Sequence, residues 1–309
     1  MLPRELVLRT CSPDDVASGL ATGELVEVEW GGSAAVALSD VAESEELLAD
    51  GLAALAEENR LAVVVGADAD ARAATLAAAL GPVPAVVLDE AHRVGLDEVL
   101  AAVEDLPEES VLALCLDPAL PLAAVPGAVA LDLAASGVCP VLAAPAPPGG
   151  TALDKARVDV AAGAWFGTTD SDRSVVEVRV SGPEEALRRV EQLVGTSIPR
   201  AFSVAPSDVA VLLAPGSLEP AAVRSVFGSD AAPQVVPLAG PLDRDWDAAV
   251  VVLGPVGPAL TRAVVYAGLR AGRRHVTVVH GAEPAALAAA VAAAPDRPRR
   301  TRLAALLTS

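Results

Sequence analysis

Two short stretches carry the side chains that could do chemistry in this chain. The first, Gly66-Ala67-Asp68-Ala69-Asp70-Ala71-Arg72-Ala73, follows an apolar run and has the length of the phosphate-binding pattern G-x-x-x-x-G-K-[ST]. In that pattern backbone N–H groups cradle phosphates, the lysine reaches them, and the hydroxyl binds magnesium. Here Ala71, Arg72 and Ala73 replace the second glycine, the lysine and the hydroxyl. The second stretch, Asp89-Glu90-Ala91-His92, follows the next apolar run.

The replacements in the first stretch disfavour a bound polyphosphate. Arg72 is cationic, but its planar guanidinium is no simple substitute for a lysine ammonium. Asp68 and Asp70 place two negative charges where phosphates would lie, and at about 5 Å and an effective dielectric near 20 each repulsion costs on the order of 3 kcal/mol. We therefore predict no tight ATP binding and no cofactor. ATP with magnesium remains the ligand to expect if the altered loop still binds one.

Composition indicates a globular protein with a large core. The chain has 309 residues, of which 53% are hydrophobic, and a net charge of −19. This length suits two domains, and the acidic charge disfavours nucleic acid unless positive charge is concentrated locally. Lys155 is the single lysine. Arginines concentrate at Arg262, Arg270, Arg273, Arg274, Arg297, Arg299, Arg300 and Arg302. They form either a polyanion-binding face or a solvated helix with a basic tail.

Cysteines and histidines suggest neither a disulfide framework nor a metal site. Cys11, Cys115 and Cys139 are too far apart for a C-x-x-C pair, and the three histidines lack metal-site spacing. We expect reduced thiols in a cytoplasmic protein. No signal-peptide pattern and no apolar run of about 18 residues is present, so we expect a chain that is neither exported nor membrane-bound.

Hydrophobic periodicity predicts an α/β protein in four segments. Residues 1–54 read as a small helical or winged-helix module, with a hairpin around Gly31-Gly32, and a connecting helix. Residues 55–145 form a first α/β domain, with strands near 61–65, 84–88 and 110–116. Residues 146–195 read as a linker and a connecting α/β segment. Residues 196–309 form a second α/β domain.

Strands and helices alternate in the second half of the chain. Strands are predicted near 174–180, 208–214, 248–253 and 275–279. Helices are predicted near 183–194, 218–227, 258–272 and 283–293. Such alternation is typical of parallel sheets covered by helices on both faces.

Five segments, in order along nearly the whole chain, resemble RecD-like superfamily 1 DNA helicases, which are P-loop NTPases. VVLDEAHRVGLDEVLAAVEDLPEES resembles the second helicase motif, a DEAH box, and Leu116-Asp117-Pro118 through LDLAASG resembles the GDPxQLPPVGPG segment. GPEEALRRVEQLVGTSIPRAF with VAVLLAP resembles the entry into the second motor domain. Asp245-Trp246-Asp247-Ala248 with VVVLGP resembles the segment after the fifth motif, and VVYAGLRAGRRHVTVVHG resembles the sixth, YTALTRARRRxTVVG. The resemblance implies two RecA-like P-loop NTPase domains with parallel sheets.

Departures from the family pattern remove most of its chemistry. The arginine that reaches the γ-phosphate falls on Ala271, and the glutamine sensor of the third motif falls on Leu120. The fourth motif becomes Pro215-Gly216-Ser217, and Ala239 to Asp243 replace the H-K-S-Q-G run of the fifth. Between Leu80 and Pro84 there is almost no room for the family's DNA-contacting insertion.

The resemblance therefore implies a pseudo-helicase: a pseudoenzyme acting as a non-hydrolysing scaffold that binds a protein partner, with a possible role in DNA maintenance. Two alternatives stay open. In an intact relative Asp89 would hold magnesium and Glu90 would orient the attacking water; here both are vestigial. The first alternative is a weak nucleotide-binding switch that uses Gly66, Arg72, Asp89, Glu90, Arg270 and Arg273. The second is ATP-independent binding of nucleic acid through Arg274, Arg297, Arg299 and Arg300. Trp165, Trp246 and Tyr266 are expected to pack in the core.

Overall fold

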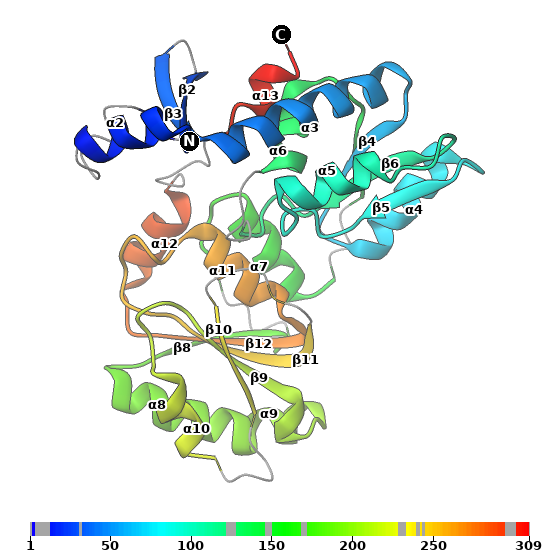
Figure 1. Cartoon of the computed structure of the whole chain (residues 1–309). Helices are drawn as coiled ribbons and strands as arrows, with labels where there is room; N and C mark the ends of the chain where they lie inside the picture. The colour runs from blue at the N-terminus through cyan, green and yellow to red at the C-terminus, as the bar shows by residue number, and fades with distance from the viewer. Residues whose placement is uncertain are drawn as a thin grey trace. The chain divides into compact units, whose positions relative to one another are not determined.

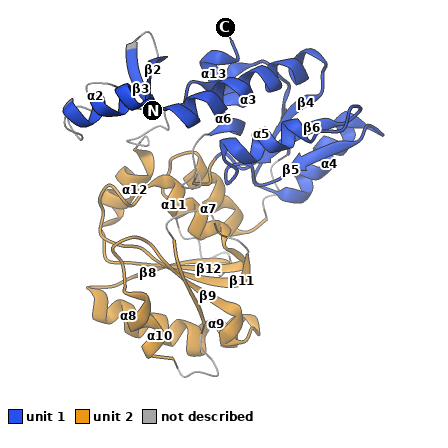
Figure 2. Ribbon diagram, in the orientation of Figure 1, with its two compact units in different colours: residues 1–118, 122–146, 298–309 blue, residues 119–121, 147–297 orange. Residues whose placement is uncertain are grey.

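The structure is a computed structural model, and it describes residues 2–3, 13–30, 33–121, 128–145, 150–167, 172–227, 233–238, 242, 245–293 and 301–308. Figure 1 labels its helices and strands, and Figure 2 colours its two compact units. Unit 1 comprises residues 1–118, 122–146 and 298–309, and unit 2 comprises residues 119–121 and 147–297. The chain thus returns to unit 1 at its C-terminal end. No helix among the described residues is long and apolar enough to cross a membrane.

A helix and a small antiparallel sheet begin unit 1. Helix α2 (Pro13–Thr22) has acidic residues in its first turn, where they interact favourably with the helix dipole. Strands β2 (Leu25–Trp30) and β3 (Ser33–Leu38) form the predicted hairpin, and β1 (Leu2–Pro3) pairs with β3. The predicted turn at Gly31-Gly32 lies outside the described residues. The finer assignment as a winged helix stays a prediction.

A parallel sheet forms the centre of unit 1, with its described strands in the order β5-β6-β4-β7. The strands are β4 (Leu61–Val65), β5 (Ala85–Leu88), β6 (Val111–Leu116) and β7 (Val141–Ala143). Every residue of β6 is buried, as expected for the centre of a sheet with both faces covered. The sequence predicted the first three strands but not β7, which is too short to show a pattern.

Helices cover the two faces of this sheet unequally. One face packs in a single apolar cluster with α3 (Ser39–Glu57), α5 (Leu96–Glu104), α6 (Val129–Ser136) and α13 (Leu303–Leu306). The other face carries α4 (Ala69–Leu80), whose Leu76 packs with Val64, Ala113 and Cys115.

Unit 2 is built on a second parallel sheet, in the order β10-β9-β11-β12-β8. Its strands are β8 (Val175–Arg179), β9 (Val209–Leu213), β10 (Gln234–Pro237), β11 (Trp246–Val252) and β12 (Gly272–His280). The sequence predicted all of these except β10. Both sheets are therefore parallel, and the α/β class predicted from the alternating pattern is confirmed.

Helices lie on both faces of the second sheet (Figure 1). On one face are α7 (Ala152–Ala161), α11 (Arg262–Arg270) and α12 (Pro284–Ala292). On the other are α8 (Pro183–Gln192), the π-helix η1 (Leu193–Ser197), α9 (Ile198–Phe202) and α10 (Pro220–Ser225), while the 3₁₀ helix η2 (Pro206–Asp208) precedes β9.

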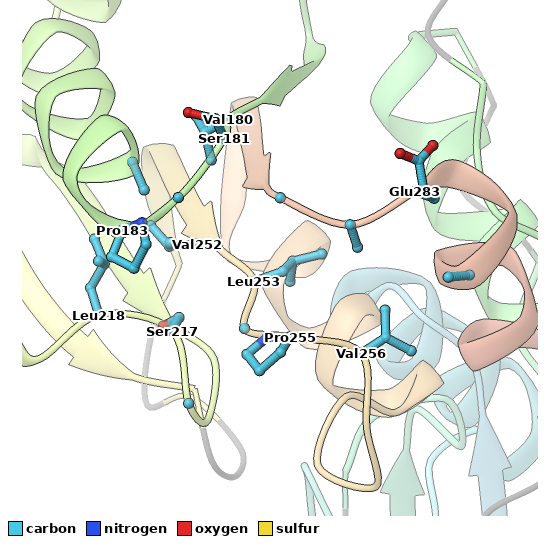
Figure 3. A pocket seen from close by; sticks show the side chains of 17 residues that line it. Val180, Ser181, Pro183, Ser217, Leu218, Val252, Leu253, Pro255, Val256 and Glu283 are labelled. Atoms are coloured by element: carbon cyan, nitrogen blue, oxygen red, sulfur yellow. The ribbon is translucent and has the colours of Figure 1, made fainter.

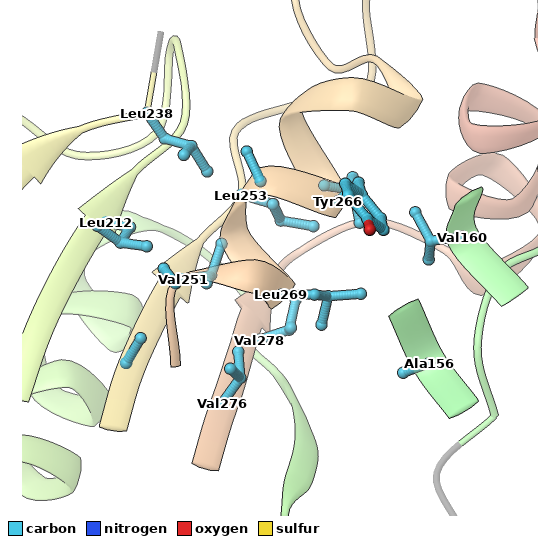
Figure 4. Packing of buried hydrophobic residues seen from close by; sticks show 14 of the residues in the cluster. Ala156, Val160, Leu212, Leu238, Val251, Leu253, Tyr266, Leu269, Val276 and Val278 are labelled. Carbon is cyan, nitrogen blue, oxygen red and sulfur yellow. The ribbon is translucent and has the colours of Figure 1, made fainter. Parts of the chain in front are cut away.

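The central strand β11 divides its side chains between two apolar clusters. Ala249 and Val251 pack on the α7 and α11 side, which Figure 4 shows, whereas Val250 and Val252 pack on the α8 side. This alternation is the period of two expected of a strand with both faces buried. The predicted burial of aromatic residues is confirmed for Trp246 and Tyr266. Trp165 is half-buried and stacks on its neighbour Phe166.

Two boundaries differ from those expected from the sequence. Segment 146–195, expected as a linker and connecting segment, supplies α7, β8 and α8 to unit 2. Residues 298–309, expected in the second α/β domain, belong to unit 1. Strand β8 pairs with β12, about a hundred residues further along the chain, and local sequence patterns do not reveal such distant partners.

Candidate functional site

The loop after β4 is held by close backbone contacts. The Gly66 N–H donates to the Leu116 carbonyl at a distance of 3.0 Å, which ties the loop to β6. A Cβ atom at Gly66 would lie 2.7 Å from the Cβ of Ala144, so a larger residue would force the two segments apart. The glycine is needed here for close approach of neighbouring backbones.

The N-terminus of α4 is capped by the chain's own carboxylate. Asp68 is the N-cap residue, and its Oδ1 accepts a hydrogen bond of 2.7 Å from the Ala71 N–H. Helix N-termini attract anions because their first N–H groups lack partners within the helix. In a phosphate-binding loop these groups face a phosphate. Here the Asp68 side chain satisfies one of them.

Arg72, on the first turns of α4, reaches back toward the sheet. Its side chain is 1% exposed, and its Nη1 donates to the Gly66 carbonyl at 2.8 Å. Its Nε and Nη2 both donate to Asp89 Oδ1, at 3.1 and 2.7 Å, and its Nη2 lies 3.7 Å from Glu90 Oε1. The guanidinium thus links the loop after β4 to both acids that follow β5.

The acids after β5 keep one side open to solvent. The Asp89 side chain is 46% exposed and that of Glu90 is 37% exposed. Glu90 has a φ of 55°, a left-handed conformation that is uncommon for a residue other than glycine. His92 is buried, with its Nε2 3.6 Å from Glu90 Oε2. Beneath them burial raises the pKa of the Cys115 thiol, with a further upward effect from Asp89.

Sheet topology explains why these groups meet. The connection after β4 leads past β6 to β5, whereas the connection after β6 leads past β4 to β7. The two connections leave in opposite directions, so the carboxyl ends of β4 and β6 form a topological switch point, the usual ligand position in an open α/β sheet. Gly66, Arg72, Asp89 and Glu90 gather at this position. The chain's own ion pairs occupy it.

The remaining residues of the predicted nucleotide set lie in unit 2. Arg270 ends α11 and Arg273 lies on β12, where its Nη2 donates to the Asp245 carbonyl at 3.3 Å. Burial lowers the pKa of Arg157, and the positive charge of Arg270 lowers it further. Ala271, in the predicted position of the γ-phosphate arginine, is 1% exposed and packs in the core of unit 2.

The described arginines between 262 and 302 differ in their surroundings. Arg274 is half-exposed, with its Nη1 3.9 Å from Asp247 Oδ2. Arg262 donates to the carbonyls of Val291 and Ala292 at the end of α12. Arg302 is buried in unit 1. Arg297, Arg299 and Arg300 lie outside the described residues.

Unit 2 contains a cavity of about 620 Å³ that the sequence analysis missed (Figure 3). It lies at the carboxyl ends of β8, β9, β11 and β12, whose following loops contribute Gly182, Gly216, Gly254 and Gly281 to its lining. A Cβ at Gly254 would lie 2.3 Å from the Pro215 carbonyl oxygen, so this loop crossing also requires glycine. The recurrence of a glycine shortly after each of these strands was the available signal.

Some polar groups around this cavity are bonded to one another, whereas the buried Ser217 hydroxyl in its lining has no hydrogen-bond partner among the described residues. Glu283, which lines it, pairs with Arg179. Hydrogen bonds from the Ser181 hydroxyl and N–H hold the pKa of the Glu185 carboxyl below its usual value. Most of the accessible lining is apolar. Among the residues that the structure describes, no group of three or more His, Cys, Asp or Glu side chains could hold a metal ion.

Comparison with known proteins gives little further information. No protein-family model matches the chain, and no curated protein matches it. Among solved structures, the chain is similar to the crystal structure of arterivirus nonstructural protein 10, a helicase, at 10% identity and a TM-score of 0.38. The similarity covers 86% of this chain and 72% of that one. So low a TM-score carries no argument about function.

Proposed function

We propose that this chain is a catalytically inactive relative of the RecD-like helicases, with two RecA-like domains, that serves as a non-hydrolysing scaffold for a protein partner. The observation that carries the proposal is the arrangement around Arg72. A residue at the position of the phosphate-loop lysine is buried and bonded to Asp89, the acid that the family resemblance assigns to magnesium. The order of the helicase-like segments supports the ancestry.

Electrostatics favours the Arg72–Asp89 ion pair over a bound nucleotide at this position. A triphosphate with its metal would have to separate Arg72 from Asp89 and displace Asp68 from the N-terminus of α4. The ligand would therefore have to replace the hydrogen bonds that Arg72 makes to Asp89 and Gly66 and the cap that Asp68 provides. Ala71 and Ala73 supply neither the glycine freedom nor the hydroxyl that would offset the loss of these contacts.

Partner choice follows from charge. With a net charge of −19, the chain as a whole repels nucleic acid and attracts basic surfaces at long range. A protein partner in DNA maintenance, as the helicase resemblance implies, fits this charge if the partner presents a basic face. ATP-independent binding of nucleic acid draws less support, because Arg302 pairs with Glu45 and Glu46 and Arg274 faces Asp247.

One observation favours the alternative of a weak nucleotide switch. The Asp89 and Glu90 side chains remain 46% and 37% exposed, so a magnesium ion could approach them from solvent. On this alternative Arg72 would move from Asp89 to a phosphate. Added ATP and magnesium would then raise the melting temperature, and Arg72→Ala would abolish the rise.

An ATP hydrolysis assay distinguishes an inactive scaffold from an active ATPase of the helicase type. ATP turnover by the purified chain is measured beside Glu90→Gln, which removes the carboxylate assigned to the attacking water but keeps its size. We expect the same background rate from both proteins, with and without single-stranded DNA. A native rate clearly above that of Glu90→Gln would contradict the proposal.

A further inference from the structure

The last described residues, 301–308, form a distinct element of unit 1. They follow the described part of unit 2 in the sequence, yet they are grouped with unit 1. Leu303 and Leu307 are buried in one cluster with side chains of α3 and α6, and Leu306 packs against it. Spacings of three and four residues place these leucines on one face of a helical turn. The faces of α3 and α6 that contact these leucines form an apolar surface on which the helical turn packs, and we call this surface the groove.

Arg302 anchors this segment through polar contacts. Its side chain is 8% exposed, and its Nε donates to Glu45 Oε2 at 3.1 Å. Its Nη1 donates to Glu46 at 2.9 Å and its Nη2 to the Ala42 carbonyl at 2.8 Å. The Arg302 backbone N–H also donates to Glu45 Oε1, at 3.2 Å. One arginine thus uses its head group and its backbone against a single stretch of α3.

Thr301 adds a contact to the other helix of the groove. Its hydroxyl donates to Asp132 Oδ2, on α6, at 2.6 Å. The segment is thus bonded to both helices. Helix α13 covers only Leu303–Leu306, and so short a helix has no stability of its own in water. Its conformation depends on the groove.

Charge complementarity indicates what kind of segment the groove accepts. Beside Arg302, residues of β2 and α3 line a separate cavity of about 240 Å³, and its lining includes Glu27, Glu43 and Glu46. The C-terminal stretch of the sequence is basic, with arginines at 297, 299, 300 and 302. An acidic groove with an apolar floor matches a basic segment that carries leucines on one face.

We propose that the groove between α3 and α6 is a binding surface for a short basic, leucine-bearing helix, and that the chain's own residues 301–308 occupy it in cis. The structure then describes the closed state of an interaction surface. Linkage within one chain gives the segment a high effective concentration, which excludes weaker competitors until the segment detaches. This inference concerns a different face from the Arg72 site, and it stands whether or not the chain binds nucleotide.

A labelled peptide tests the proposal directly. The probe is the fluorescein-labelled peptide PRRTRLAALLTS, residues 298–309, followed by fluorescence anisotropy with the full native chain and with full-length Arg302→Ala. The variant loosens the internal segment, so we expect the peptide to bind it on the order of a hundredfold more tightly than the native chain. The same peptide carrying Arg302→Ala should lose on the order of a hundredfold in affinity. Equal affinity for the two proteins, or no binding to a folded variant, would overturn the proposal.

Two further measurements apply to the native chain. Hydrogen exchange should show residues 303–308 opening more readily than β4 and β6, because the segment detaches without global unfolding. If those amides exchange only through global unfolding, the segment is an ordinary part of the core and the proposal is refuted. This test uses the native chain, so it holds even if Arg302→Ala fails to fold. Sedimentation supports occupation in cis if the native chain is a monomer. A dimer that Arg302→Ala dissociates would instead assign the groove to a second copy and contradict it.

Discussion

In unit 1, the switch point at the carboxyl ends of β4 and β6 holds charged groups bonded to one another, whereas in unit 2 the carboxyl ends of the strands surround a mostly apolar cavity of about 620 Å³. Both sheets are parallel, and in each the connections that follow two neighbouring strands lead to opposite sides of the sheet. The same architecture therefore provides a position for a ligand twice. Side chains decide what fills it: Arg72 in one case, and glycines that leave space in the other.

Charge separates the two units as well. By sequence, unit 1 carries 25 acidic and 8 basic residues, and unit 2 carries 16 and 14. Nearly all of the net charge of −19 therefore belongs to unit 1. An acidic unit of this kind stabilises the few buried cations it contains, and Arg72 and Arg302 are its two buried arginines among the residues described. Removing either one should affect unit 1 far more than any surface change in unit 2.

Arg302→Ala should have the largest effect on stability. It leaves Glu45, whose side chain is 3% exposed, without its cation. The expected loss in the free energy of unfolding is about 3 kcal/mol, measured by urea denaturation. Arg273→Ala, at an arginine that is exposed in unit 2, serves as the control and should change stability by less than about 0.5 kcal/mol. Similar losses from both variants would break the distinction between the units.

Arg72→Ala should be the next most damaging. Its loss removes hydrogen bonds to Gly66 and Asp89 and leaves a void under the loop. We expect about 2–3 kcal/mol of destabilisation, less than for Arg302 because solvent reaches Asp89. Arg72→Lys keeps the charge but not the forked geometry, and it should recover only part of the loss. Full recovery by lysine would show that charge alone holds the site.

Gly254→Ala probes the cavity of unit 2. The added Cβ meets the Pro215 carbonyl oxygen at 2.3 Å, so the crossing of the two loops must shift. An expected cost of about 1–2 kcal/mol follows from overpacking. Gly257→Ala, with open space around its Cβ, is the matched control and should change stability by less than about 0.5 kcal/mol. A tolerated Gly254→Ala would mean that these loops are not tightly fixed.

A gradual pH effect should sharpen the comparison further. Burial raises the pKa of Asp132 to about 6; the Thr301 hydrogen bond lowers it and the negative charge of Glu45 adds to the rise. Because the folded state holds this proton more tightly than the unfolded chain, Asp132 favours folding below about pH 4. That contribution is lost as the pH rises through 6. Urea denaturation between pH 4 and pH 7 should show the decline, and Asp132→Asn should remove it. An identical pH profile in the variant would exclude Asp132 as the cause.

Local patterns were enough to predict most strands. The strands that were missed are short or lack alternation, and the pairing of distant strands could not be predicted. The apolar runs at β4 and β6 show their burial directly in the sequence. Strand β7 has three residues, and β10 follows a stretch without clear alternation, so neither gave a signal. Within 146–195, predicted as a linker and a connecting α/β segment, the predicted strand and helix are present. Local periodicity does not report that β8 joins its sheet through β12.

Only part of the candidate site followed from the sequence. Spacing predicted that Gly66, Arg72, Asp89 and Glu90 would lie together, and they do. It did not predict that Arg72 would turn inward to Asp89, since the motif equally allows a cation that faces a ligand. Competition between an internal carboxylate and an external phosphate depends on burial and distance, which require coordinates. The same holds for Arg302, which the sequence placed in a basic tail and which the structure places beside Glu45.

The central claim is that Arg72, paired with Asp89, fills the position that a phosphate would take in unit 1. Isothermal titration with ATP and magnesium, to millimolar concentration, tests it most directly. The native chain and Arg72→Ala are titrated side by side, with circular dichroism confirming that both are folded. The account predicts no saturable heat from the native chain. Saturable binding by the native chain that disappears in Arg72→Ala would contradict it, because Arg72 would then hold a nucleotide rather than Asp89.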